Sequence, residues 1–506
     1  MNIEPQNLSA EQAQKIPDEV LWTLEQLHNA GYESYIVGGC VRDILLDREP
    51  HDFDITTNAH PEQIIDVFEK TDRRVVYENN FGTVGIINKD LQKDNVCYEI
   101  EITPYRTESG YSDNRHPDRV SFSDSIHEDV KRRDFTINAM AYDPISETLV
   151  DDFEGCHDLE KKILRTVGIP HERFTEDALR IMRMVRFSAQ LGFIGETNTV
   201  AAAKELAPNL NTISSERIRD EFVKLVDADF AKDGMELMRR YGLLEYVIPE
   251  FLDGVGCDQG GIHSFDVWTH LVKSLEHGTN KNYPLYVKLS ALFHDIGKPK
   301  TRRKANGRGT KEWTFYGHEV VGSKMTHAIM KRLKFSKDIT DKVVKLVRYH
   351  MFFSDPDAIT LSAVRRMVKN VGQELIWDLM DLRTCDRIGT GRPKEKPYRL
   401  RKYHAMIEEV IRDPISVGML KINGDIMIGE MGLQPGRKMG WILHALLEEV
   451  LDDPSLNTRD YLEQRTREMY EMSDDDVQKL GEAGRDKKDD VEFQAIKKLH
   501  RKHSVK

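Results

Sequence analysis

Two aspartates separated by a single residue, Asp52 and Asp54, are placed where they could hold a divalent cation. The segment around them is typical of a β-strand, in which alternate side chains leave the same face. Two carboxylates held that close repel each other unless a cation lies between them. A pair of magnesium ions that joins an attacking hydroxyl to a nucleoside triphosphate requires ligands of this kind.

Further groups suited to such a site flank the two aspartates. A third carboxylate is expected from a neighbouring strand, where Glu99 and Glu101 share a face and either could serve. Upstream, a short strand over 35–37 runs into Gly38 and Gly39, and a helix follows. Backbone N–H groups exposed at such a junction can cradle a triphosphate.

The two aspartates alone are a weak signal, because most such pairs mark turns or surface faces. The run Gly38–Asp43 followed closely by His51–Ile55 is far more specific and resembles the class II tRNA nucleotidyltransferases. That family comprises the CCA-adding enzymes and bacterial poly(A) polymerases of the polymerase-β-like superfamily. Four more segments resemble family motifs in the same order: Asp113–Val120 (a flexible loop), Arg132–Ala139 (ribose and triphosphate), Glu176–Arg180 (nucleotide selection) and Glu216–Glu221 (the neck helix).

The resemblance implies roles for individual residues. It predicts these site residues: Asp52, Asp54 and Glu101 for catalytic metal; Gly38, Gly39, Arg42, Arg133, Asp134, Asn138, Asp177 and Arg180 for nucleotide; and Arg183, Arg186, Arg217 and Arg219 for RNA. Magnesium is the implied cofactor, ATP and CTP the implied substrates, and tRNA the implied partner.

Base selection is assigned to Asp177 and Arg180, which we expect to be neighbours on one helical face because they are three residues apart. An aspartate acceptor and a planar guanidinium donor can pair with the Watson–Crick edge of a base. In isolation the same pair would indicate an ordinary surface salt bridge. Its position downstream of the metal motif favours the functional interpretation.

A second group of metal-ligating residues lies further along the chain. His294 and Asp295 are adjacent in an apolar helix, where burying both is costly without a partner such as a metal ion. Further histidines and acids recur at long intervals: His270, His318, His350 and Asp386. A lone histidine of this kind is usually a satisfied core residue, but six positions across about 120 residues favour a site.

This arrangement resembles the HD-domain phosphohydrolases. The resemblance implies metal ligands at His270, His294, Asp295 and Asp386, and a second metal or a phosphate at His318 and His350, with Lys298 neutralising substrate. It also implies a divalent metal of unspecified identity and phosphatase or 2′,3′-cyclic phosphodiesterase action on RNA ends.

Composition constrains the setting of these sites. The chain has 506 residues and a net charge of −12, yet basic stretches at 300–311 and 391–402 show that charge is distributed unevenly. Five scattered cysteines without CxxC spacing favour a reducing cytoplasm over structural zinc. No apolar run is long enough to span a membrane, and the N-terminal residues lack a signal-peptide core. Nothing in the sequence indicates an oligomeric state.

The periodicity changes along the chain and predicts an α+β fold. Short β-type segments occur over 1–155, and helical patterns predominate after it. The resemblance implies a polymerase-β-like head with a small mixed sheet (1–155), followed by all-helical parts: a neck and body that select nucleotide and bind RNA (156–255), an HD domain (256–400) and a tRNA-binding tail (401–475). The charged end (476–506) is expected to be flexible.

CCA addition to the 3′ end of tRNA is the first functional hypothesis, because the segment 108–120 resembles the loop that CCA- and A-adding enzymes keep. Glycines and Pro435 over 423–440 resemble the tRNA-holding tail of bacterial CCA-adding enzymes. The alternatives are an A-adding enzyme, a poly(A) polymerase, and, from another class, an HD phosphohydrolase whose head merely binds nucleotide or RNA.

Overall fold

The computed structural model describes residues 8–77, 82–92, 95–109, 119–260, 264–305, 312–352, 359–412 and 417–504. The chain divides into two compact units: unit 1 contains 1–350 and 381–392, and unit 2 contains 351–380 and 393–506. Residues 351–380, which the sequence assigned to the HD domain, thus group with unit 2. Most of the expected loop over 113–120 lies outside the described residues.

The N-terminal head is built on one mixed sheet, in the strand order β3-β4-β5-β2-β1-β8-β9. Its strands are β1 (Ser34–Val37), β2 (Asp54–Thr57), β3 (Arg74–Tyr77), β4 (Val84–Ile87), β5 (Glu99–Pro104), β8 (Ala141–Asp143) and β9 (Thr148–Val150). The central pair β2 and β5 is parallel, and the other pairs are antiparallel. The predicted small mixed sheet is confirmed.

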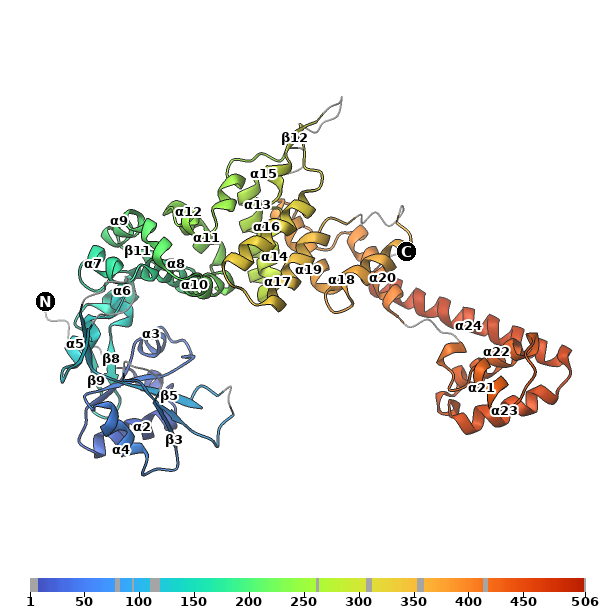
Figure 1. Ribbon diagram of the computed structural model, residues 1–506, viewed down its shortest axis with the longest axis horizontal. Helices are drawn as coiled ribbons and strands as arrows, with labels where there is room; N and C mark the ends of the chain where they lie inside the picture. The colour runs from blue at the N-terminus through green and yellow to red at the C-terminus, as the bar shows by residue number, and fades with distance from the viewer. Residues whose placement is uncertain are drawn as a thin grey trace. The chain divides into compact units, whose positions relative to one another are not determined.

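Helices cover this sheet through apolar faces that the sequence predicts. In α2, Val20, Leu24 and Leu27 recur at helical spacing and are fully buried. Figure 1 shows α2 and α4 in the blue head beside the strands. The remaining head elements are α1 (Ala10–Ala13), α2 (Asp18–Asn29), α3 (Gly39–Leu45), α4 (Pro61–Phe68), α5 (Ile126–Lys131), the 3-10 turn η1 (Thr136–Asn138) and the hairpin β6 (Arg106–Ser109) with β7 (Arg119–Phe122).

Beyond the head the chain is almost entirely helical, as predicted. The next segment contains α6 (Gly155–Lys161), α7 (Pro170–Glu176), α8 (Leu179–Leu191), α9 (Thr197–Glu205), η2 (Ala207–Thr212), α10 (Ser215–Asp227), α11 (Ala231–Arg240), α12 (Leu244–Val247) and η3 (Pro249–Gly254). Two short strands, β10 (Ile163–Leu164) and β11 (Ile194–Gly195), pair in parallel. The central helix α8 packs against α10 and α11, which connects the head to the helices that follow.

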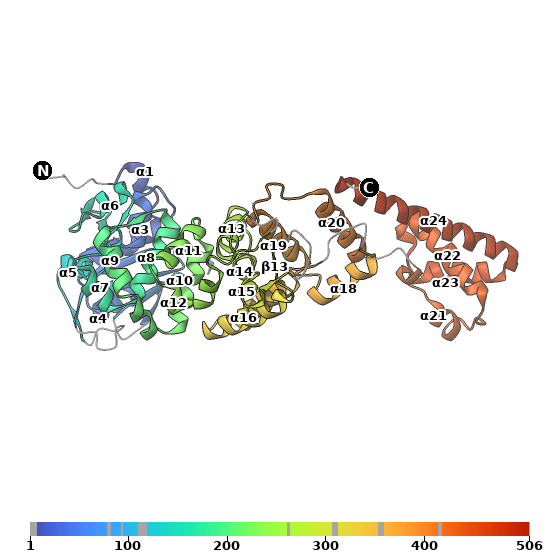
Figure 2. The same cartoon turned by 90° about the horizontal axis from the view of Figure 1, so that it is seen from above.

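The HD segment follows as a helical group with one short hairpin. Its elements are α13 (Val267–Asn280), α14 (Leu285–Phe293), α15 (Lys298–Thr301), β12 (Arg303–Lys304), β13 (Trp313–Thr314), α16 (His318–Arg332), α17 (Lys337–Tyr349) and α19 (Ile376–Gly389). Figure 2 shows α13, α14 and α16 gathered in the middle of the chain. Their apolar residues continue the core of the neck, with Trp268 stacked edge-on against Phe251.

Unit 2 has a separate apolar core. Its described elements are α18 (Leu361–Val371), α20 (Tyr398–Ile411), η4 (Val417–Met419), α21 (Gly424–Gly429), α22 (Arg437–Asp452), η5 (Pro454–Leu456), α23 (Arg459–Glu471) and α24 (Asp474–Lys502). No helix in the described parts of the chain is both long and apolar enough to cross a membrane.

The charged C-terminal segment differs from the flexible end predicted for 476–506. It forms most of α24, which runs beside α22 (Figures 1 and 2). Val477 is fully buried, and Gly481 and Gly484 bring the two backbones close, so that a Cβ on Gly484 would lie 2.2 Å from the carbonyl oxygen of His444. Because glycine adds no side-chain bulk, a largely polar helix still packs closely here.

Candidate functional site

The first site begins where β1 enters α3 through Gly38. This glycine has a φ of +83°, and a Cβ at its position would lie 2.9 Å from Nη1 of Arg133. A side chain here would be strained and would also displace the guanidinium. The junction thus holds an arginine directly against the backbone, as a site for an anionic ligand requires.

The two aspartates lie at the start of β2. Asp54 is its first residue, and the register places it directly beside Glu101 on the parallel strand β5. Ile55 is fully buried while Asp54 and Glu101 keep accessible side chains, so the acidic face of the sheet is open to solvent. The expectation that strand pairing brings Glu101 to Asp54 is met by this register.

Electrostatics couple the two aspartates. The side chain of Asp54 reaches solvent, but neighbouring protein atoms partly desolvate its carboxyl group and raise its pKa. The negative charge of Asp52 raises this pKa further. The guanidinium of Arg133 acts in the opposite direction. Mutual repulsion of this kind favours a bound cation. The three acids Asp52, Asp54 and Glu101 do not bring their oxygens within 4.8 Å of one another as a group.

A chain of polar contacts joins the nucleotide-binding residues expected from the sequence. Arg42 donates to Oδ1 of Asn138 at 2.8 Å, and Nδ2 of Asn138 donates to Asp134 at 3.1 Å. Asp134 also accepts from Nε of Arg183 at 2.7 Å. Burial would raise the pKa of Asp134, but Arg183 and the Asn138 amide hold it well below its usual value. The carboxylate stays ionised and fixes these side chains in place.

Two residues that the sequence reasoning did not single out organise the arginines. Asp129 on α5 is fully buried and accepts from Arg132 at 2.8 Å and from Arg133 at 3.3 Å. The ring of Phe187 lies beneath the guanidinium groups of three residues: Arg42, Arg183 and Arg186. The spacing of Asp129, three and four residues before the arginines on a helix, is a signal that could have found it.

The base-selecting pair is arranged differently from the prediction. Asp177 does not lie on a helix with Arg180, because its backbone is extended (φ −145°, ψ 104°) between α7 and α8. Its carboxylate accepts from the backbone N–H of Leu179 at 3.0 Å and pairs with Arg217 at 2.6 Å. An aspartate suits this position, one residue before the N-cap Ala178, because its carboxylate satisfies the free N–H of the first residue of α8.

Arg180 has its own partners. Its guanidinium pairs with Glu176 at 2.5 Å and donates to the carbonyl oxygen of Arg173 at 3.0 Å. A further contact reaches the carbonyl oxygen of Arg132 at 3.4 Å. Asp177 and Arg180 are therefore each held rigidly, by different residues.

The arginines predicted to bind RNA have different surroundings. Arg186 is only 8% exposed, pairs with Glu221 at 2.7 Å and lies 3.9 Å from the centre of Phe187. Burial lowers the pKa of Arg186 to about 10 despite Glu221. An RNA contact by Arg186 is not favoured, because its guanidinium is enclosed between α8 and α10. Arg219 is more accessible and donates to the carbonyl oxygen of Lys334 at 2.5 Å.

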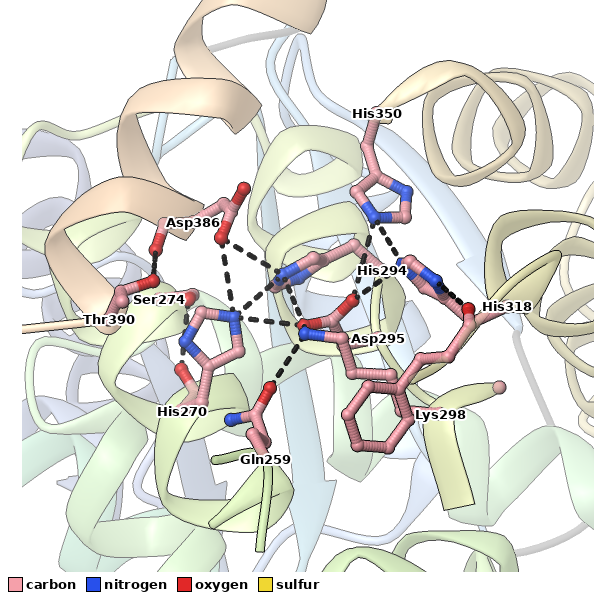
Figure 3. A network of polar contacts seen from close by, with 12 residues as sticks. Gln259, His270, Ser274, His294, Asp295, Lys298, His318, His350, Asp386 and Thr390 are labelled. Carbon is pink, nitrogen blue, oxygen red and sulfur yellow. Dashed lines mark hydrogen bonds and ion pairs between the residues drawn. The ribbon is translucent and has the colours of Figure 1, made fainter. Parts of the chain in front are cut away.

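The second site is a cluster of buried side chains around Asp295 (Figure 3). One group of ligand atoms within 4.8 Å of one another comes from His270, His294 and Asp295, and another from Asp295, His318 and His350. Asp295 belongs to both groups, so its carboxylate can bridge two metal positions. Oδ1 of Asp386 lies 3.5 Å from Nε2 of His270 and completes the predicted set.

Hydrogen bonds to the backbone fix the ring orientation of three histidines. Nδ1 lies 2.8 Å from Ala291 O in His294, and 2.7 Å from Phe315 O in His318 and from Val347 O in His350. A carbonyl oxygen only accepts, so each Nδ1 carries a proton and Nε2 of each ring is directed into the cluster, where it can bind a metal ion. This is how histidines are prepared to bind metal.

The charges of the cluster also favour a cation. Nε2 of His270 lies 2.9 Å from Nε2 of His294, and that of His318 lies 3.2 Å from that of His350. Burial lowers the pKa of His350 to about 4, so its ring is neutral at neutral pH. Burial acts likewise on His294, but the carboxylates of Asp295 and Asp386 outweigh it and raise the pKa of that ring. A metal ion would satisfy the same negative charge.

Close helix packing places these ligands. A Cβ on Gly297 would lie 2.3 Å from the carbonyl oxygen of His318 and 2.6 Å from the amide nitrogen of Gly322. Only glycine allows α16 to approach the end of the His294–Asp295 segment this closely. The contact sets His318 opposite Asp295, with Nε2 and Oδ1 3.2 Å apart.

Lys298 lies at the edge of the cluster. Its ammonium group is 2.5 Å from Oδ2 of Asp295 and donates to Oε1 of Gln259 at 2.6 Å (Figure 3). Gln259 is buried and also donates to the carbonyl oxygen of Phe265. The sequence reasoning missed Gln259, because it lies in an irregular loop that no motif marks.

Family models match the segments of the chain that carry the two sites. Residues 34–165 match a family model described as the poly A polymerase head domain, and residues 260–387 match the HD domain. Between them, residues 192–254 match a model described as a probable RNA and SrmB-binding site of polymerase A. A polymerase head and an HD domain imply the use of divalent metal.

The chain is similar to curated proteins over most of its length. It is 32% identical over 454 residues to the CCA-adding enzyme of Lactobacillus helveticus. This match covers 89% of this chain and 97% of that protein. The chain belongs to the CCA-adding enzyme family. The CCA-adding enzyme of Streptococcus gordonii is 47% identical over 229 residues, a match that spans 45% of this chain and 55% of that protein.

Solved structures of CCA-adding enzymes share the fold. The crystal structure of the Bacillus stearothermophilus CCA-adding enzyme in complex with CTP superposes with a TM-score of 0.57 and 26% identity. The superposition covers 89% of this chain and 96% of that one. The Thermotoga maritima enzyme complexed with tRNA is 18% identical with a TM-score of 0.52 and supports the fold alone.

Proposed function

We propose that this member of the CCA-adding enzyme family extends the 3′ end of tRNA with CTP and ATP at the β2–β5 site of the head. Asp52, Asp54 and Glu101 would hold magnesium ions, which when bound stabilise the developing negative charge on phosphate. The observation that carries the proposal is the parallel register that sets Asp54 beside Glu101, on the accessible face of the sheet and near the guanidinium of Arg133. The relatives that the chain resembles along most of its length carry the same activity in their names.

In this reaction the terminal 3′-hydroxyl oxygen of the tRNA attacks the α-phosphorus of the nucleotide. A new phosphodiester bond forms as the bond to the outgoing pyrophosphate breaks. Arg133 and Arg42 would bind the triphosphate, since both guanidinium groups lie against the Gly38–Gly39 junction. Asp134 would act through Asn138 and Arg183, which it holds, and would face the ribose.

Base choice would rest on Asp177 and Arg180. Each is held in one position by its own partner, Arg217 for Asp177 and Glu176 for Arg180, so their hydrogen-bonding groups are preorganised without a nucleic-acid template. The variant Asp177→Ala is expected to misincorporate UTP and GTP while its KM for CTP stays within a few-fold of the wild type. Unchanged selectivity would remove Asp177 from this role.

One assay separates CCA addition from the alternatives. The full chain and magnesium are incubated with tRNA ending at the discriminator base, in C or in CC, and CTP and ATP are supplied separately and together. Three added residues that require both nucleotides support CCA addition. A single A added only to the CC substrate would indicate an A-adding enzyme, and long A-tails would indicate a poly(A) polymerase.

We further propose that the HD cluster hydrolyses phosphomonoester or 2′,3′-cyclic phosphate ends. The observation that favours it is the double group of ligand atoms that shares Asp295, an arrangement suited to two metal ions about 3.5–4 Å apart. Hydrolysis would add water across a P–O bond, which opens a cyclic diester or releases phosphate. Phosphate release from a 3′-phosphorylated RNA end and opening of a 2′,3′-cyclic end to a phosphomonoester test it, and both should be lost in His294→Asn. Neither reaction with Mg²⁺, Mn²⁺, Ni²⁺ or Co²⁺ would contradict it.

A further inference from the structure

The segment between two residues of the HD cluster forms a short arm. Lys298 and His318 both contact Asp295, and the chain between them leaves the cluster, pairs β12 with β13 and returns. Figure 1 shows β12 standing away from the neighbouring helices. We call the described residues 300–305 and 312–316 the hairpin arm. Because the arm starts and ends next to residues of the HD cluster, a ligand bound along the arm would lie close to that cluster.

The hairpin arm is strongly basic. Lys300, Arg303 and Lys304 are exposed, and Arg302 is half-buried. None of these four cations forms an ion pair with a carboxylate among the described residues, and Glu312 is the single acid in the described arm. Lys300 lies close enough to Glu250 to lower the pKa of that carboxyl group, but the arm as a whole carries an excess of positive charge. Such an excess next to a proposed site for phosphate esters favours a polyanionic ligand.

Aromatic side chains alternate with these charges. The guanidinium of Arg302 lies 3.8 Å from the centre of the Trp313 ring, which forms a flat surface at the base of the arm. Tyr316 is 88% exposed, the largest exposed fraction among the large hydrophobic side chains in the described chain. It is adjacent to Phe315, whose carbonyl oxygen holds the ring of His318. An aromatic ring presented to solvent this close to a metal ligand is suited to stack on a base.

We propose that the hairpin arm binds the single-stranded end of an RNA and directs its terminal phosphate to the HD cluster. The preferred substrate is then an oligonucleotide rather than a free mononucleotide. This inference rests on the proposed hydrolase function. A single phosphate reaches the cluster without contacting the arm, whereas a strand offers phosphates to Arg303 and Lys304 and a base to Tyr316. An acidic peptide would engage the cations but would leave the exposed ring without a partner.

The test compares two substrates and two variants in the full, metal-loaded chain. The substrates are a hexanucleotide with a 2′,3′-cyclic phosphate end and the corresponding cyclic mononucleotide. Tyr316→Ala and the double variant Arg303→Ala/Lys304→Ala should each lower kcat/KM for the hexanucleotide about tenfold, within the range that loss of a stacked base gives. Both should leave kcat/KM for the mononucleotide and the metal content unchanged. The matched control Lys324→Ala/Lys331→Ala, which removes two exposed charges from α16, should leave both substrates unaffected.

Equal losses on the two substrates, or no loss on the hexanucleotide, would overturn the proposal. If the wild type hydrolyses neither substrate, the hydrolase function fails, and fluorescence anisotropy with a labelled hexanucleotide still decides the role of the arm. Binding that is weaker in Tyr316→Ala than in the α16 control supports an RNA-binding arm. Binding equal in both, or displacement of the RNA by a poly-glutamate peptide at equal charge, contradicts it.

Discussion

The head site and the HD site hold their proposed metal ligands in opposite ways. In the HD cluster six side chains converge in the buried interior, and backbone carbonyls fix the three histidine rings His294, His318 and His350. In the head, Asp52 and Asp54 are accessible and their oxygens do not gather with Glu101 within 4.8 Å. What the head fixes rigidly is the set of arginines around them.

The difference follows from whether the metal ion stays in the protein or arrives with the substrate. A buried cluster of histidines and acids is a resident site, because such groups are costly to bury without a cation. An accessible pair of aspartates suits magnesium that arrives with the triphosphate, since Mg²⁺ keeps several waters and takes oxygen ligands from substrate phosphates. We therefore expect the HD metal to be retained by the isolated protein and the head metal to depend on nucleotide.

The largest effect is expected from Asp54→Ala. Loss of this carboxylate should lower the rate of C and A addition at least about a thousandfold, equivalent to about 4 kcal/mol, because the remaining ligands cannot hold the metal. Primer-extension assays measure the rate, and elemental analysis should show an unchanged HD metal content. Retained addition would break the assignment of the head site.

The converse change is Asp295→Asn, which replaces the carboxylate shared by both HD ligand groups with an uncharged amide. Metal that copurifies with the chain should fall to near zero, while tRNA extension stays within about twofold of the wild type if the sites act separately. Asp295→Asn also leaves Lys298 without its ion-pair partner. His350→Gln therefore serves as a milder second variant, which should lower the metal content only in part. A loss of tRNA extension in both variants would show that the sites are coupled.

A pH titration should distinguish the regions in the metal-stripped chain. Burial holds the pKa of His350 near 4, below the ordinary value of about 6.5, so the unfolded state takes up a proton first as the pH falls. The HD region should therefore lose up to about 3 kcal/mol of stability between pH 6.5 and 4. The depressed pKa of Asp134 keeps the head network intact over this range.

The same titration on His350→Gln provides the control. This variant should lose the contribution of His350 and keep that of His294, whose raised pKa acts in the opposite direction, as followed by thermal unfolding with a chelator present. A wild-type slope in the variant would mean that His350 is not the group that responds.

The smallest effect concerns the packing that positions the HD ligands. Gly297→Ala should destabilise the HD region by about 2 kcal/mol, because its Cβ would overlap the backbone of α16, and should weaken metal retention with it. Gly322→Ala on the facing helix is the matched control, since its Cβ would make ordinary contacts at 3.4 Å or beyond. Similar melting temperatures for the two variants would contradict the packing argument.

Much of this arrangement could be predicted from the sequence, because the determinants are local. Alternation along β5 places Glu101 on the accessible face, and the resemblance to HD-domain phosphohydrolases selected the four histidines and two acids that the structure brings together. The exact partners could not be predicted. Asp177 leaves the helix to cap α8, which spacing alone does not reveal, and Arg186 is buried by a partner 35 positions away, Glu221.

The C-terminal end shows a further limit of composition. Its high charge indicated a flexible segment, yet the small residues Gly481 and Gly484 allow α24 to lie against α22. Close approach of two helices depends on which residues face each other. The tertiary structure shows which residues face each other, whereas the helix propensity of each residue indicates this only weakly.

Counting bound metal tests the central claim most directly. The Asp295→Asn chain, with its HD metal removed, is titrated with Mn²⁺ in the presence and absence of a nonhydrolysable CTP analogue, and bound ions are counted by electron paramagnetic resonance. We predict Mn²⁺ binding that requires the nucleotide and is lost when Asp52→Ala and Asp54→Ala are added. Nucleotide-dependent Mn²⁺ that persists in that triple variant would contradict the proposal that these two aspartates hold the metal.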